Sequence, residues 1–137
     1  MIRPHPAAHS PRRGGVALWL PVALYMGAIY YGAGMSQTPG PAAQFSDTFL
    51  HMGGYVGLAL LTLRATSGGR WSGVTPRALG LAFVIATVHG ATVEIEQMFV
   101  PSRFAEWRDL WNDMIGAALG LAIGWLWAKS RWGKMNG

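Results

Sequence analysis

Apolar residues dominate four long segments of the chain, and short polar or charged stretches separate them. Each segment is close to the roughly 20 residues that an α-helix needs to cross the hydrocarbon core of a bilayer. The pattern therefore predicts an all-α integral membrane protein, a four-transmembrane-helix bundle with spans at 16–35, 47–63, 78–99 and 110–128. The second span is short and carries His51, so a re-entrant segment is the alternative there.

The distribution of basic residues orients this bundle. Nine of the eleven Lys and Arg residues lie before the first span, between the second and third, or after the fourth, and the two exceptions are Arg103 and Arg108. Because basic residues favour the cytoplasmic side of a membrane, both termini are predicted to be cytoplasmic. We expect a disordered cytoplasmic tail over 1–15, the four-helix membrane domain over 16–128 and a basic cytoplasmic tail over 129–137.

The composition excludes several classes of function. The 137 residues leave room for one domain, only 12% of them are charged, and cysteine is absent. The chain therefore has no disulfide framework, no thiolate nucleophile and no cysteine metal site. The net charge of +5 is accounted for by the membrane topology, so nucleic acid is not an expected partner. No GxSxG, P-loop or GxGxxG pattern supports a hydrolase, an NTPase or a dinucleotide-binding protein.

Glycines at four-residue spacing predict where the helices pack within the chain, because they let another backbone approach closely, and a dimer interface is the alternative. They occur in the second span at Gly53 and Gly57, and in the fourth at Gly116, Gly120 and Gly124. Asp109 and Asp113 continue the stripe of the fourth span toward its outer end. Both carboxylates are therefore predicted to point into the bundle rather than into lipid.

Two other spans bring polar side chains to the same outer end, where five of the six acidic residues gather between positions 94 and 124. On the third span, Glu94 and Gln97 share a face that is predicted to be buried. A second stripe of that span, rotated well away from the first, carries His89, Thr92 and Glu96. On the second span, one face carries Asp47, His51 and Tyr55 at four-residue spacing.

These residues support two interpretations. In the first, they satisfy one another: Arg103 pairs with Asp109 or Glu94, His51 bonds Asp47, and the cluster fixes the register of the helices. In the second, they form a functional site open to the outer surface, where a histidine exchanges protons and an arginine holds a phosphate or a carboxylate. The candidate catalytic residues are then Glu94, Asp109 and His51, and the candidate ligand-binding residues are Arg103, Gln97, Asp113, Asp47 and Tyr55.

Neither a metal nor another cofactor is expected from the sequence. A Zn or Mn site made of His51, Asp47 and Glu94 is an alternative, but the chain lacks HExxH or any other tight ligand spacing. Haem bound by His51 and His89 would suit a four-helix membrane bundle. Two isolated histidines, however, more often form hydrogen bonds between helices, and this is the expectation for both.

The outer-end residues carry a resemblance to a known family. The stretch Glu94-x-x-Gln97-x-Phe99-Val100-Pro101-x-Arg103, followed by Asp109 and by Gly116-Ala117-x-x-Gly120, resembles the signature of VanZ-like membrane proteins. The Asp, His and Tyr at four-residue spacing on the second span also match the family, and the resemblance covers residues 16–128. The chain departs from the family at Asp113, where an asparagine is usual, and at Ser102, where a glycine is frequent.

The resemblance implies a small multi-pass protein of the bacterial cytoplasmic membrane with a role in the cell envelope. The family is named for a member that gives low-level resistance to the glycopeptide teicoplanin. The leading hypothesis is that the outward-facing polar cluster binds or modifies an envelope lipid or amphiphile, such as a lipid-linked precursor, and so affects glycopeptide susceptibility. The competing hypothesis is a structural or accessory subunit of a larger membrane complex, which would have other membrane subunits as partners.

Overall fold

The computed structural model describes residues 14–35, 47–101 and 106–135, and these residues fold into helices without any β-strand. The α-helices are α1 (Gly15–Ala33), α2 (Asp47–Thr66), α3 (Pro76–Gln97) and α4 (Trp107–Met135), and a short 3-10 helix, η2 (Trp71–Gly73), lies between α2 and α3. The all-α prediction and the four predicted helices are confirmed. The last helix continues to Met135, into the segment predicted as a basic tail, whereas most of the predicted N-terminal tail lies outside the described residues.

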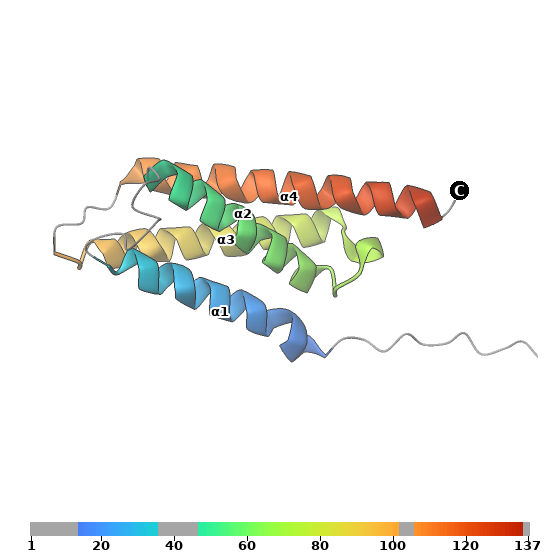
Figure 1. Cartoon of the computed structure of the whole chain (residues 1–137), viewed down its shortest axis with the longest axis horizontal. Coiled ribbons are helices and arrows are strands. Elements are labelled where there is room, and N and C mark those ends of the chain that lie inside the picture. The colour runs from blue at the N-terminus through green and yellow to red at the C-terminus, as the bar shows by residue number, and fades with distance from the viewer. Residues whose placement is uncertain (1–13, 36–46, 102–105, 136–137) are drawn as a thin grey trace, which may run out of the picture.

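The four helices alternate in direction (Figure 1). The beginning of α1, the connection between α2 and α3, and the end of α4 lie at one end of the bundle. The end of α1, the beginning of α2, the end of α3 and the beginning of α4 lie at the opposite end, which we call the acidic end because the buried carboxylates described below lie there. The most extensive packing is between α2 and α4, and α1 packs mainly against α2.

Local signals set the boundaries between α2 and α3. Gly68 and Gly69 adopt positive φ angles of 66° and 71° directly after α2, a backbone conformation that glycine adopts at little cost. The side chain of Thr75 then caps α3 by accepting a hydrogen bond from the Ala78 N–H at 3.2 Å. Pro76 occupies the first helical position, where its missing N–H would have no helical partner.

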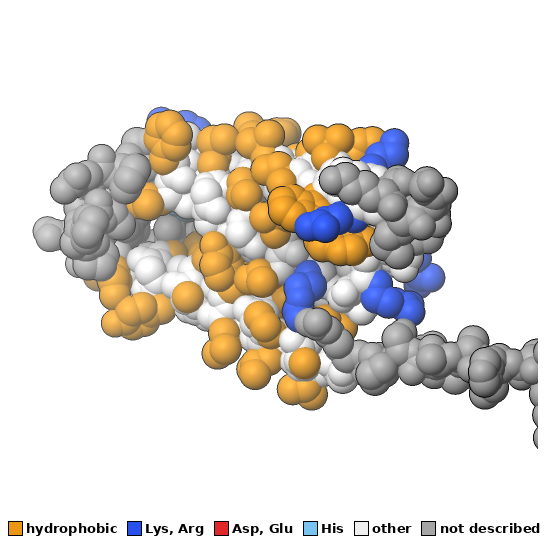
Figure 2. Space-filling model, turned by 45° about the vertical axis from the view of Figure 1, so that its right-hand side comes forward, with side chains coloured by type: hydrophobic (Ala, Val, Ile, Leu, Met, Phe, Trp, Pro, Cys, Tyr) orange, Lys and Arg blue, Asp and Glu red, His pale blue; other side chains and the backbone are white. Residues whose placement is uncertain are grey.

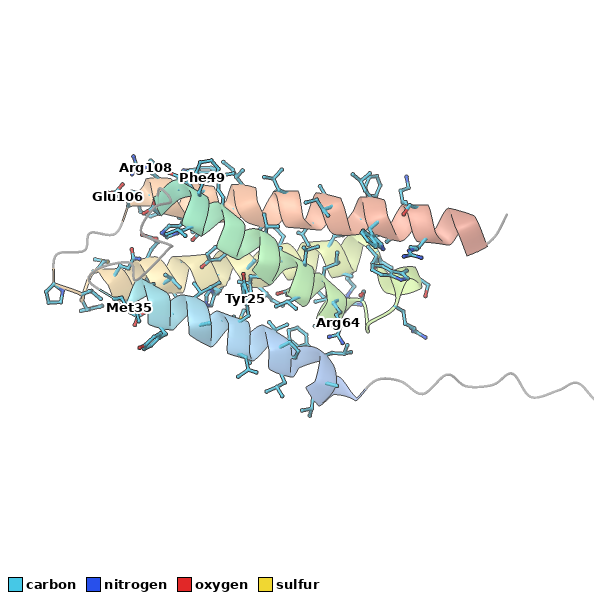
Figure 3. All side chains as sticks on the ribbon, viewed as in Figure 1. Tyr25, Met35, Phe49, Arg64, Glu106 and Arg108 are labelled. Carbon is cyan, nitrogen blue, oxygen red and sulfur yellow. The ribbon has the colours of Figure 1, made fainter. Side chains whose placement is uncertain are left out.

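The glycine stripe of α4 lies against α2, as the spacing predicts. A Cβ at Gly116 would meet the backbone of Met52, and one at Gly120 would lie 2.6 Å from the carbonyl oxygen of Val56. On α2, Gly57 lies against the Tyr25 side chain of α1, whose position Figure 3 shows. The prediction for Gly53 is wrong, because this residue is exposed and a Cβ there would meet nothing within 4 Å. Gly53 lies on the side of α2 that no described helix covers.

The face of the bundle that Figure 2 shows carries many apolar side chains. By length and composition alone, α1 and α3 are the two described helices apolar enough to be recognised as membrane spans, and only 11% and 39% of their most apolar windows are buried. A core helix of a soluble protein would bury most of such a stretch. The apolar side chains of α1 and α3 instead point largely outward, as expected for helices that face lipid.

Candidate functional site

A cluster of polar side chains is buried at the acidic end, between α2, α3 and α4. Its members are His51 from α2, Glu94 from α3, and Asp109 and Asp113 from α4, and we call these four residues the acidic-end cluster. Glu94 is 7% exposed, Asp109 is 9% exposed and Asp113 is completely buried. The helical spacing therefore identified correctly which carboxylates of α3 and α4 point into the bundle.

His51 connects α2 to both aspartates of α4. Its Nδ1 lies 2.9 Å from Oδ1 of Asp113, a hydrogen bond in which the ring N–H donates to the carboxylate. Its Nε2 lies 3.8 Å from Oδ2 of Asp109. The structural interpretation of the sequence paired His51 with Asp47 instead, but the Asp47 side chain lies outside the described residues. The close approach of α2 to the glycine stripe explains why His51 reaches the aspartates that continue this stripe.

Glu94 is held by the start of α4. Its Oε2 accepts a hydrogen bond of 3.0 Å from the backbone N–H of Glu106, directly before the first helical residue of α4. The carboxylate thereby satisfies a donor that has no partner within the helix. The Glu106 side chain itself points outward and pairs with Arg108, with Oε2 and a guanidinium nitrogen 3.0 Å apart (Figure 3). This contact could not be predicted from the sequence, because a backbone donor leaves no signal in the residue type.

Several oxygens of the cluster are buried without a partner. Oε1 of Glu94, Oδ1 of Asp109 and Oδ2 of Asp113 are inaccessible to solvent, and no described residue donates a hydrogen bond to them. Buried polar atoms of folded proteins are nearly always hydrogen-bonded. The cluster therefore has spare acceptor capacity and a surplus of carboxylates over the single histidine.

A second polar contact lies deeper in the bundle. The hydroxyl group of Tyr55 is 3.0 Å from Nδ1 of His89, and the ring of His89 packs edge-on against Tyr30 with centroids 5.8 Å apart. Both histidines thus form hydrogen bonds between helices, His51 to α4 and His89 to α2, as expected from the sequence. His89 is buried although its stripe was predicted to lie well away from the site, because α1 and α2 cover that side of α3.

The remaining candidate residues are distributed around the cluster. Gln97 is buried on the same face of α3 as Glu94, with 2% of its surface exposed. Glu96 lies on the other side of this helix, where it lines an open cavity of about 340 Å³ with Tyr30, Tyr31 and Gly34 of the α1 end. Arg103 lies outside the described residues, so its predicted pairing with Asp109 or Glu94 stays a prediction.

A groove of about 330 Å³ lies beside the cluster, between the end of α3 and the beginning of α4. Its apolar walls include Ile95, Met98 and Trp107, whose exposed fractions of 56%, 65% and 81% show that the groove opens onto the outer surface. Glu94 lines the groove as well and is the one member of the acidic-end cluster that does so. Ala91, Glu106 and Leu110 complete the lining.

Comparison with family models identifies a match. No curated protein and no solved structure matches the chain. The family model described as VanZ/LLP1 matches residues 16–128, a stretch that contains every described residue of the cluster and the groove. Together with the two outward-facing apolar helices, this match indicates a membrane protein. The chain belongs to the VanZ/LLP1 family.

Proposed function

We propose that the protein is a multi-pass protein of the bacterial cytoplasmic membrane, with four spans and both termini in the cytoplasm. The up-and-down arrangement of the helices brings the beginning of α1 and the end of α4 to one end of the bundle (Figure 1). Most of the visible Lys and Arg side chains gather toward that end (Figure 2). The 20 residues of α2 extend over about 30 Å, the thickness of the hydrocarbon core. The acidic-end cluster then lies in the outer leaflet.

Single cysteines test this topology, because the chain has no cysteine of its own. Ser72 lies in the exposed connection between α2 and α3, and Phe99, which follows α3, is 82% exposed. A membrane-impermeant maleimide should label the Phe99→Cys protein in intact cells, and should label the Ser72→Cys protein only after the membrane is opened. Labelling of both positions from the same side would contradict the proposed topology.

We further propose that the acidic end binds, or modifies, the head group of an amphiphile of the cell envelope, such as a lipid-linked precursor. One observation carries this proposal: Glu94 belongs both to the buried cluster and to the wall of the groove. An acyl or polyprenyl chain fits a groove with walls of Ile95, Met98 and Trp107 that is open toward lipid. The head group of the same molecule would then lie beside Glu94.

The chemistry of the cluster suits a head group that is rich in donors. Glu94, the cluster member in the wall of the groove, keeps Oε1 without a donor among the described residues. Sugar hydroxyls, peptide amides and amines are donors, and each hydrogen bond to a buried carboxylate contributes about 1.5–3 kcal/mol. His51, which contacts both aspartates, holds these carboxylates in place beside such a group.

Glu94→Gln tests whether the cluster functions in the envelope or only holds the fold together. The variant keeps the shape and most of the hydrogen-bonding capacity of the side chain, including an oxygen that accepts from the Glu106 N–H. We expect it to accumulate in the membrane like the wild-type protein, but to lose the protein's effect on teicoplanin tolerance in a strain that lacks the natural copy. His51→Gln should behave in the same way.

Matched variants separate the site from its surroundings. Glu96→Gln removes the same charge two residues away, on the opposite side of α3, and should keep the wild-type tolerance. Ala91→Phe should block the groove and abolish the effect, whereas Val88→Phe adds the same ring at a position that is 57% exposed and outside the groove lining. Normal tolerance in well-expressed Glu94→Gln and Ala91→Phe strains would favour an accessory subunit over a lipid site.

A further inference from the structure

We propose that His51, Glu94 and Asp109 form a binding site for one divalent transition-metal cation, of the Zn²⁺ or Mn²⁺ type. Each residue offers one ligand atom, and the three atoms lie within 4.8 Å of one another. The ligands are one imidazole nitrogen and two carboxylate oxygens, which come from three different helices. A set of three protein ligands with a free coordination position is typical of metal sites that also contact a water molecule or a substrate.

The positions of the free atoms support a bound cation rather than a closed hydrogen-bond network. Nε2 of His51 and Oδ2 of Asp109 are 3.8 Å apart, too far for a hydrogen bond. Two ligands that each lie about 2.1 Å from a tetrahedral ion are separated by about 3.4 Å, so a small inward movement would bring both into contact with the ion. A second, independent observation points to a ligand: Oδ1 of Asp109 and Oε1 of Glu94, on side chains of residues that are 9% and 7% exposed, are buried acceptors without a described donor.

The groups around the three ligands orient them as a metal site requires. A histidine that binds a metal usually donates its other ring N–H to a carboxylate, which fixes the tautomer and the orientation of the ring. Asp113, which is completely buried, accepts from Nδ1 of His51 at 2.9 Å and leaves Nε2 for the metal. Glu94 is fixed in the same manner, because Oε2 accepts from the Glu106 N–H and Oε1 stays free.

Charge and ligand type select the class of ion. Three buried carboxylates face one histidine within the acidic-end cluster, so a divalent cation would balance charge that is costly to bury. Imidazole suits Zn²⁺ and similar transition metals, whereas Mg²⁺ and Ca²⁺ prefer sites made of oxygen alone. The site differs from the alternative considered in the sequence, because Asp109 takes the position given there to Asp47. No short motif signals it, since its ligands come from three separate helices.

Metal titration of the purified full-length protein tests the inference directly, without any lipid ligand. Every protein carries His5→Ser and His9→Ser, so that the histidines of the N-terminal segment contribute no binding, and the affinity tag contains no histidine. After treatment with a chelator, calorimetry with Zn²⁺ and electron paramagnetic resonance with Mn²⁺ should show saturable binding of one ion per chain. Absence of saturable binding of either ion would overturn the proposal.

Conservative variants assign the ligands. Loss of an outer partner of a metal ligand weakens metal binding by about 10- to 100-fold. Loss of a ligand itself should weaken binding at least as much, and we expect this of Glu94→Gln, Asp109→Asn and His51→Gln. Asp113→Asn, which changes only that outer partner, should fall within this range. Glu96→Gln removes a carboxylate from the other side of α3 and should bind like the wild type. Equal affinity of the wild type and the three ligand variants would show that the ion binds elsewhere and would overturn the proposed ligand set.

These experiments can contradict the proposed metal site and the proposed lipid site independently of each other. Ala91→Phe changes the groove but none of the three ligands, so it should bind Zn²⁺ with unchanged affinity. Loss of teicoplanin tolerance in this variant, together with normal metal binding, would support both proposals. Normal metal binding with normal tolerance would leave the metal site standing and contradict the groove as the lipid site.

Discussion

Exchange of Gly120 for alanine should lower the free energy of unfolding by about 1–3 kcal/mol, the usual cost of forcing extra atoms into a packed interface. The new Cβ would lie 2.6 Å from the carbonyl oxygen of Val56 and 3.1 Å from Cβ of Ala59, both on α2. The clash is with backbone, which cannot turn away as a flexible side chain can. The free energy of unfolding of the variant can be measured in mild detergent by titration with a denaturing detergent. A leucine at the same position should prevent α2 from packing on α4 altogether.

Gly53→Ala is the matched control for this prediction. It makes the same chemical change in a helix that belongs to the same interface, but a Cβ at Gly53 would meet nothing within 4 Å. Alanine also has a higher helix propensity than glycine, by about 1 kcal/mol in a helix interior. Gly53→Ala should therefore be neutral or slightly stabilising. Equal losses of stability in the two variants would contradict the assignment of the α4 stripe to the contact with α2.

The four helices could be predicted from the sequence because length, apolar content and the prolines and polar breaks between segments act locally. The orientation of α4 could be predicted as well, since a glycine stripe indicates which face meets a neighbour and Asp109 and Asp113 continue it. The two glycines of α2 have no such continuation, and they predicted the packing of their helix less well. Gly57 packs against Tyr25, whereas Gly53 faces away from the described bundle.

Which residues form the site depends on contacts between helices, and the spacing of residues within one helix does not reveal these contacts. His89 was placed on a stripe away from the site, yet α1 and α2 cover that stripe and Tyr55 reaches His89 from α2. The bond from the Glu106 N–H to Glu94 involves a backbone donor at a helix start, a group that every residue except proline provides. The groove beside Glu94 results from the relative placement of α3 and α4, and the sequence alone does not fix that placement.

Asp113 is completely buried, and it differs from the residue that is usual in the family signature. VanZ-like proteins resemble this chain around the site but usually carry asparagine at this position, and here the carboxylate accepts the hydrogen bond from His51 at 2.9 Å. An asparagine oxygen can accept the same bond. The difference between a charged and a neutral acceptor is about 1 kcal/mol, so Asp113→Asn should cost little stability. The amide of the new asparagine would have to fit beside Gly90, where space is tight. A Cβ built on that glycine would lie 2.9 Å from Oδ2 of Asp113.

Asp113→Leu should have the largest effect of any single change in the cluster. It removes the acceptor and leaves the polar Nδ1 of His51 without its partner inside the bundle. Loss of one partner of a buried pair costs about 3–5 kcal/mol, because the other partner stays buried and uncompensated. The measurement is the same unfolding titration in mild detergent, carried out with a chelator so that bound metal does not contribute.

The His51→Leu exchange in the Asp113→Leu background completes the test. If the two side chains stabilise the fold mainly through each other, the double variant should be more stable than the sum of the two single losses predicts, by about 0.5–3 kcal/mol. Tyr25→Phe provides an unrelated second site, since it changes the α1–α2 contact at Gly57 and should add independently to Asp113→Leu. Additive losses for His51 and Asp113 as well would mean that the bond between α2 and α4 contributes nothing to stability. In that case the buried carboxylates would need another partner, such as the proposed cation, to explain why the bundle keeps them inside.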